Sequence, residues 1–128
     1  MDYISSNSMR LMERSMNYLW TKQTAISDNI TNAETPNYKA KVVTFEENLR
    51  EKLEQAMRSG TPRTNMRNVI ENSRISVTTT QDSTRLDGNG VNVTEQMVEL
   101  VRNAYQLQYV MNAISTDLNT LRTAIGGK

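Results

Sequence analysis

The chain has 128 residues, a length that fits one domain. Hydrophobic residues make up 37% of it and aromatic residues 5%, which is lean beside the roughly 45–50% apolar content of an average globular domain, so a partner is expected to complete the core. The 15 basic and 14 acidic residues give a net charge of +1, which argues against nucleic-acid binding, and the absence of cysteine and histidine excludes disulfides, thiolate or imidazole metal ligands and imidazole bases.

The first predicted element is a long helix over residues 5–34. Alternating steps of three and four residues land on apolar side chains with one exception, and this spacing predicts the seam of a coiled coil. The exception is Gln23, which we interpret as a tolerated surface position, with a register-fixing polar residue as the alternative. Pro36 lacks an N–H, so the helix is expected to end near Glu34. The seam positions are Met9, Met12, Met16, Leu19, Gln23, Ile26, Ile30 and Ala33.

Neither a secretory signal nor a membrane span is expected. A signal needs an apolar stretch of about 7–15 residues after a basic start, and a span needs roughly 18 apolar residues. Polar side chains interrupt every candidate stretch near the N-terminus, at Asp2, Asn7, Arg10, Glu13 and Arg14.

Residues 35–92 form a polar middle segment with one predicted short helix over 45–58. Thr44 and Glu47 have the spacing of a capping box before this helix, and Gly60 and Pro62 are expected to end it. Its apolar residues recur every fourth position, at Phe45, Leu49, Leu53 and Met57.

The rest of the middle segment, from Thr61 to Gly90, is expected to be mostly irregular. Ile75 and Val77 alternate with polar residues, which allows one short β strand or one arm of a hairpin. The run from Thr78 to Gly90 is rich in Thr, Asp, Ser and Gly, and is expected to be a mobile loop.

The last predicted element is a second long helix over residues 93–125. Asn92 and Glu95 are placed to cap its start, and Gly126 with Gly127 is expected to stop it. A second stripe with 3-4 spacing runs along it, and we expect this stripe to mate with the first stripe and with neighbouring subunits. Methionine at several positions of both stripes favours equally an adaptable contact surface and ordinary core filling. The second stripe contains Val93, Met97, Leu100, Ala104, Leu107, Met111, Ile114, Leu118, Leu121 and Ile125.

No motif for chemistry emerges from the residues. Most carboxylates have a basic partner at helical spacing, which is typical of a solvated helix face. The segment Asp87-Gly88-Asn89-Gly90 resembles part of a calcium loop, but it lacks the further acidic ligands and is expected to be a turn. There is no phosphate-binding glycine loop. We therefore predict no catalytic, cofactor-binding or metal site, and no enzyme.

The segment from Asn29 to Ala40, NITNAETPNYKA, is more specific than any periodicity. It resembles the N-terminal signature of the flagellar rod and hook family, whose first helix ends in Asn-Ile-x-Asn-Ala-x-Thr-Pro-Gly-Tyr. Asn37 stands where that family has glycine, and because asparagine tolerates positive φ the turn is expected to persist. The matching positions are Asn29, Ile30, Asn32, Ala33, Thr35, Pro36 and Tyr38.

Within that family the chain is most similar to the FlgB type. The similar features are Lys39-Ala40, Phe45, the Leu86-Asp87-Gly88-Asn89 string and the ending Ala124 to Lys128. The resemblance covers roughly residues 5–45 and 86–128, and leaves residues 60–85 unmatched.

The resemblance implies a single rod-type domain over residues 1–128, mainly α, in which the two long terminal helices pair as an α-helical coiled coil. It implies a structural subunit of the flagellar proximal rod, the torque-transmitting drive shaft of the basal body. The implied partners are copies of itself, rod subunits such as FlgC, the ring-to-rod adaptor FliE and the flagellar type III export apparatus, through which such proteins pass without a cleaved signal. No nucleic acid, small-molecule substrate or cofactor is implied. The alternative is a soluble helical adaptor or secretion chaperone, which explains the two stripes but not the NITNAETPNYKA string.

Overall fold

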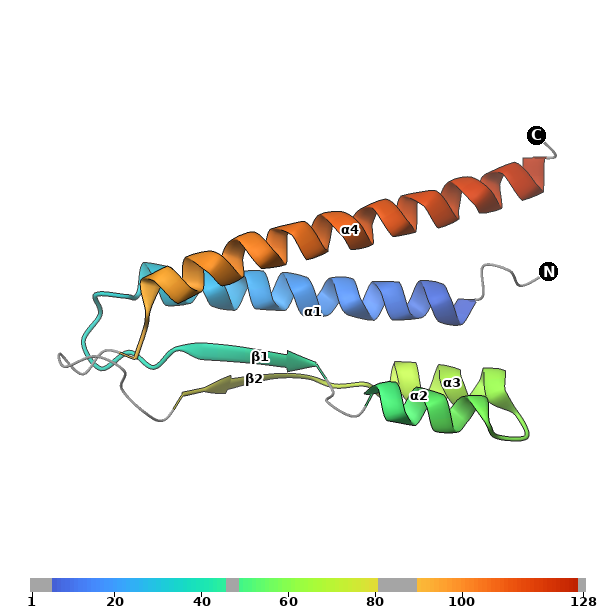
Figure 1. The fold of residues 1–128 in the computed structure, drawn as a ribbon, viewed down its shortest axis with the longest axis horizontal. Coiled ribbons are helices and arrows are strands. Elements are labelled where there is room, and N and C mark those ends of the chain that lie inside the picture. Colours follow the sequence, from blue (N-terminus) through green and yellow to red (C-terminus); the bar gives the residue numbers. More distant parts are fainter. Residues whose placement is uncertain (1–5, 46–48, 81–89, 127–128) are drawn as a thin grey trace.

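A computed structural model of the chain describes residues 6–45, 49–80 and 90–126. As the sequence predicts, the fold is mainly α, with two long terminal helices and a short β element in the middle segment. That β element is a two-stranded antiparallel sheet, and the sequence predicts only its strand around Ile75 and Val77. The helices α1 and α4 run antiparallel, and both termini lie toward the same end of the molecule (Figure 1). In chain order the elements are α1 (Ser6–Thr31), β1 (Lys41–Phe45), α2 (Leu49–Met57), α3 (Pro62–Glu71), β2 (Ile75–Thr79) and α4 (Val93–Gly126).

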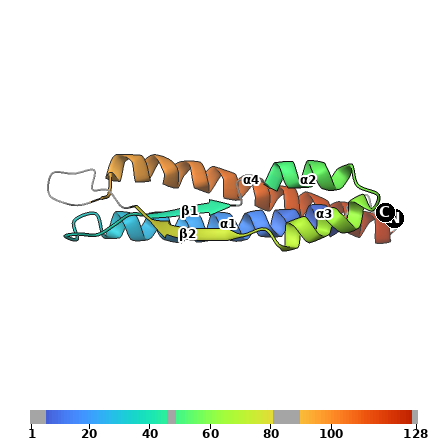
Figure 2. The ribbon, with the colours of Figure 1, turned by 90° about the horizontal axis from the view of Figure 1, so that it is seen from below.

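The helix α1 lies between two layers. On one side it packs against α4, in the most extensive contact between two elements, and on the other it contacts β1 and α3 (Figure 1). Figure 2 looks onto the second layer, where β1 and β2 lie side by side and the pair α2–α3 continues beyond them. Since α1 has neighbours on both sides, it can bury more than one face, and Leu19, Ala25 and Ile26 are all buried.

The sheet is a two-stranded antiparallel ladder that runs from the pair Lys41–Thr79 to the pair Phe45–Ile75. The strand β1 reads KVVTF, and its β-branched residues favour an extended backbone. The middle residue Val43 is buried, whereas Val42 and Thr44 are exposed, as alternation along a strand requires. The helix predicted over residues 45–58 is therefore shorter, because α2 spans Leu49–Met57. Thr44 and Phe45 belong to β1, and Glu47 lies outside the described residues.

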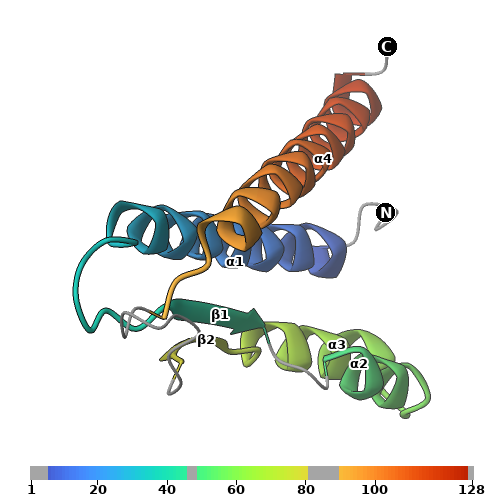
Figure 3. The ribbon, with the colours of Figure 1, turned by 60° about the vertical axis from the view of Figure 1, so that its left-hand side comes forward.

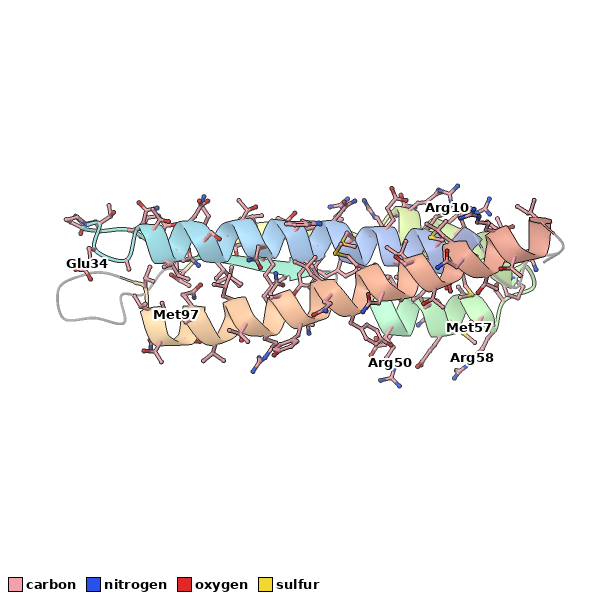
Figure 4. All side chains as sticks on the ribbon, turned by 90° about the horizontal axis from the view of Figure 1, so that it is seen from above. Arg10, Glu34, Arg50, Met57, Arg58 and Met97 are labelled. Carbon is pink, nitrogen blue, oxygen red and sulfur yellow. The ribbon has the colours of Figure 1, made fainter. Side chains whose placement is uncertain are left out.

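The helix α3 occupies a stretch that the sequence predicts to be mostly irregular, so that prediction is wrong for residues 62–71. Pro62 sits at its start, where the missing N–H costs no hydrogen bond, so this proline begins a helix. Met66, Val69 and Ile70 supply one apolar face, and Ile70 is fully buried. Figure 4 shows that Arg50 of the neighbouring α2 and Arg58, which follows α2, project away from α1.

Two arginines of α1 fasten α3 at its C-terminal end. Arg14 donates hydrogen bonds to the carbonyl oxygens of Glu71, at 3.1 Å, and of Ser73. Arg10 forms an ion pair with the Glu71 carboxylate. Since the last carbonyls of a helix lack intrahelical donors and carry partial negative charge, a guanidinium there is favourable.

The helix α4 has 34 residues, which corresponds to a length of about 51 Å. The Asn92 side chain accepts a hydrogen bond from the Glu95 N–H at 3.3 Å, which confirms the predicted cap. Toward its C-terminus α4 diverges from α1 (Figures 1 and 3), and every residue from Ser115 to Gly126 except Asp117 is exposed. None of the helices that the structure describes combines the length and apolar character that a membrane crossing requires.

Candidate functional site

The matched motif builds a buried corner where α1 ends, β1 begins and α4 begins. At its centre the Asn29 side chain is 1% exposed. Its amide nitrogen donates to the Lys41 carbonyl and to Gln96 Oε1 of α4, each at 2.9 Å. Its amide oxygen accepts from the Lys41 N–H at 2.8 Å and from the Tyr38 hydroxyl at 3.2 Å. One amide therefore links three elements, which explains why asparagine occupies this position.

The residues after α1 form a tight turn. The Asn32 amide donates to the Asp28 carbonyl at 2.8 Å, and the Thr35 hydroxyl donates to Asn32 Oδ1 at 3.1 Å. The Tyr38 N–H then bonds back to the Thr35 carbonyl at 3.3 Å. Asn37 has a φ of 61°, so the positive φ predicted for this position is confirmed. Proline followed by a residue with positive φ is the signature of a type II turn.

A small apolar cluster closes the corner. Ala33, Ala40 and Val91 are buried together, and Tyr38 and Val93 pack against them. The cluster brings the end of α1 and the start of α4 together through side chains that are mostly small. Below it, the Lys41 ammonium bonds the Asp28 carboxylate at 3.0 Å, and the hydrogen bond and charge of Asp28 raise the pKa of Lys41 above its ordinary value.

The side of α4 that packs on α1, here called the contact face, is partly polar. Its members are buried or half-buried residues on one side of α4: Gln96, Leu100, Asn103, Leu107, Val110 and Ile114. Asn103, at 1% exposure, donates its amide nitrogen to Gln23 Oε1 at 2.8 Å and to the Leu19 carbonyl at 2.9 Å. Lys22 and Glu99 add an ion pair of 3.2 Å beside it.

The first predicted stripe lies largely inward. Leu19, Ile26 and Ala33 are buried, and Met9, Met12, Met16, Gln23 and Ile30 are half-buried. Gln23 accepts a hydrogen bond from Asn103 within the helix pair. Its interpretation as a tolerated surface position is therefore wrong.

The second predicted stripe is divided between interior and solvent. Leu107 is buried, and Val93, Leu100 and Ile114 are half-buried. The other members of the stripe are exposed: Met97, Ala104, Met111, Leu118, Leu121 and Ile125. Sequence reasoning missed Asn103 and Gln96 because a search for apolar spacing passes over polar positions. A signal was present, since both stand seven residues apart on one side of α4.

Opposite the contact face, α4 exposes a second set of large apolar side chains, here called the outer face. Met97, Val98 and Val101 are each a little over half exposed, and Tyr105 and Tyr109 are exposed by 70% and 76%. Figure 4 labels Met97 near the first turns of α4. An apolar set of this size on one side of a helix marks an interaction surface.

Beside the outer face, an open groove of about 450 Å³ runs between α1, β1 and α4. Aromatic rings line much of it, and two of them, Tyr18 and Phe45, stack with ring centroids 5.5 Å apart. The remaining lining residues are Ser15, Leu19, Tyr105, Gln106, Tyr109 and Val110. None of the described residues that line the groove is charged, so the groove suits an apolar protein surface better than a charged small molecule.

The described residues contain no group of three or more acidic side chains placed to hold a metal ion. The predicted motif positions Asp87, Gly88 and Asn89, and most of the predicted mobile loop, lie outside the described residues. The site is therefore a set of packing and hydrogen-bonding surfaces on α1 and α4.

Comparisons with curated proteins find similarity to structural proteins of the flagellum. The chain is 31% identical over 128 residues to the flagellar basal body rod protein FlgB of Bacillus subtilis (strain 168), across 96% of this chain and 97% of that protein. It is also 31% identical over 106 residues to the flagellar basal body rod protein FlgB of Borrelia hermsii, across 75% of this chain and 78% of that protein. No family model matches the chain.

Proposed function

The chain belongs to the FlgB family of flagellar basal body rod proteins, and from that premise we propose that it is a structural subunit of the proximal rod that assembles through its terminal helices. In this role it forms part of the torque-transmitting drive shaft. The observation that carries the proposal is the outer face of α4, whose apolar side chains have no cover within the described chain. A subunit that completes its burial only among neighbours fits the lean apolar content of the sequence.

The geometry supports a load-bearing role. The contact between α1 and α4 combines buried apolar residues with hydrogen bonds between side chains, and both helices are long and continuous. Backbone hydrogen bonds run along each helix, so the pair resists bending without covalent links. The C-terminal third of α4 extends this architecture beyond its contact with α1, and Leu118, Leu121 and Ile125 on it are available to neighbours.

The proposed partners are other copies of the chain, further rod subunits such as FlgC and the adaptor FliE. Export through the flagellar type III apparatus, without a cleaved signal, would bring the subunit to the periplasmic part of the basal body. The domain is proposed to act as one rod-type unit over residues 1–128.

A charge on the outer face tests the proposal. Val101 is 55% exposed, so Val101→Asp should leave the chain folded while placing a carboxylate where a neighbour would bury it. We expect loss of motility and loss of the protein from detergent-extracted basal bodies, at normal cellular protein level and normal helix content by circular dichroism. Leu107 is unsuited to this test because it is buried within the chain itself, and Leu107→Asp would unfold the subunit.

Gln55→Asp is the matched control, since Gln55 is an exposed residue of α2, away from both terminal helices. This variant should be motile and present in basal bodies. Recovery of Val101→Asp in complete rods would contradict assembly through the outer face. Absence of the unaltered protein from basal bodies would contradict the rod role itself.

A further inference from the structure

The helix α4 offers two apolar faces, so apolar spacing alone does not decide which one packs on α1. The outer face carries Met97, Val98, Val101 and two tyrosines. The contact face carries Leu100, Leu107, Val110 and Ile114, but it also carries two amides. By composition the exposed face is at least as apolar as the face that is buried. Apolar content therefore does not explain why the contact face, and not the outer face, packs on α1.

The amides supply the cause through hydrogen bonds that only this orientation allows. Asn103 reaches Gln23 Oε1 at 2.8 Å, and seven residues earlier Gln96 Oε1 accepts from Asn29 at 2.9 Å. Both bonds cross between α1 and α4, and they form the two amide bridges of the interface. The partners on α1 are six residues apart, which is consistent with one antiparallel register.

We infer that the two amide bridges assign the faces of α4, because they pair the partly polar face with α1 and thereby leave the more apolar outer face exposed. A rotated α4 would set Val101 or Met97 against Gln23. That amide would then be buried without a partner, and a buried amide without a hydrogen bond is strongly unfavourable. Gln23 thus destabilises an arrangement in which the outer face packs on α1. Asn103 stabilises the observed arrangement by its hydrogen bond to Gln23.

An asparagine at position 103 is better explained by selection of one orientation of α4 than by a gain in folding stability. Asn103 Oδ1 is buried and has no hydrogen-bond partner among the described residues. A leucine at this position would bury apolar surface and leave no such atom. A buried polar residue that costs stability but fixes one arrangement is known from helix pairs, where a single asparagine sets the register.

The buried residue Val91, just before α4, does not determine which face of α4 packs on α1. Val91 is fully buried and fixes where α4 begins. Val93 packs against the same cluster, whereas Asn92 and Thr94 are exposed, so burial of side chains next to Val91 acts on the first turn of α4 alone. The choice of face falls to the contacts along the helix.

Cysteine labelling of the dilute monomeric chain tests the inference, since the native sequence has no cysteine. Single thiols are introduced by Val101→Cys on the outer face and by Leu107→Cys on the contact face, and their rates with a thiol reagent are compared. In the otherwise unaltered chain the thiol at position 101 should react at least about tenfold faster, because the thiol at position 107 reacts only after local opening.

The change Gln23→Met keeps the side-chain length and removes the amide. We expect it to lower the ratio of the two labelling rates by at least about threefold, with helix content unchanged, because both faces of α4 then fit α1. Thr24→Met is the matched control on an exposed neighbouring position and should leave the ratio unchanged.

An unchanged ratio in a folded Gln23→Met chain would overturn the inference. Loss of helix content in this variant would also overturn it, because Gln23 would then act through stability and not through choice of face. The measurement uses the isolated chain, so its outcome is independent of whether the protein assembles into a rod.

Discussion

At the scale of single residues, the motif near the end of α1 can be explained by the hydrogen bonds of its side chains. Asn29 makes four hydrogen bonds with three residues, Lys41 of β1, Gln96 of α4 and Tyr38 in the connection between α1 and β1. Asn37 provides the positive φ of the turn. The sequence allowed the turn and its φ to be predicted, because proline followed by asparagine has few alternatives. It did not allow the partners of Asn29 to be predicted, since Gln96 lies 67 residues away and only the fold brings it close.

Removing the Asn29 side chain should be costly. Asn29→Ala leaves the Lys41 N–H and carbonyl, the Tyr38 hydroxyl and the Gln96 amide without this partner. We expect a loss of about 2–4 kcal/mol in the free energy of unfolding, measured by urea denaturation. Asn17→Ala on the exposed side of α1 should change it by less than about 0.5 kcal/mol. Equal effects of the two substitutions would contradict the central role of Asn29.

The turn after α1 gives a second prediction. Asn37 has a φ of 61°, a conformation that a residue with a Cβ and no local polar group adopts reluctantly. Asn37→Ala should lower the free energy of unfolding by roughly 1 kcal/mol, while Asn37→Gly should be neutral within about 0.5 kcal/mol. Both values can be read from thermal unfolding by circular dichroism, with Lys39→Ala as the control. A neutral alanine variant would argue against strain in the turn.

At the scale of elements, the long helices were predictable and the short ones less so. The terminal stripes hold their spacing over many turns, and the cap at Asn92 has its own local signature. The strand β1 was missed because Thr44 and Glu47 imitate a helix cap, although KVVTF is rich in β-branched residues. The helix α3 was missed because Pro62 was interpreted as a stop, when proline is also favoured at the first position of a helix.

Burial along α4 predicts a gradient of stability within one helix. The contact face packs on α1 as far as Ile114, whereas the twelve residues from 115 to 126 are exposed, except for the half-buried Asp117. Amide hydrogen exchange in dilute monomer should therefore be faster beyond position 115 than between Gln96 and Ile114, by at least about tenfold. Uniform protection along α4 in a proven monomer would contradict this. In assembled rods the difference should shrink, because neighbours would cover the C-terminal turns.

At the scale of the whole molecule, the sequence identified the pairing of the terminal helices but not the orientation of the second one. The predicted stripe of α4 straddles the contact face and the solvent, since Leu107 is buried and Met97 is exposed. When a helix has two apolar faces, the spacing of its apolar residues does not show which face packs on the partner helix. The distinguishing information lies in the amides at positions 96 and 103, and their partners on α1 become known only in three dimensions.

The ladder between β1 and β2 gives the molecule a tolerant site for added sequence. The pairing of Phe45 with Ile75 means that the chain leaves β1 toward α2 and returns from α3 into β2 at neighbouring points, far apart along the sequence but close in space. Gly60 lies between these two helices, and an added Cβ there would meet no atom within 4 Å. Inserting a short epitope after Gly60 should therefore preserve helix content and motility, whereas the same insertion after Asn37 should abolish both. The turn between α2 and α3 would then serve as the place to attach a fluorophore for following the subunit in living cells.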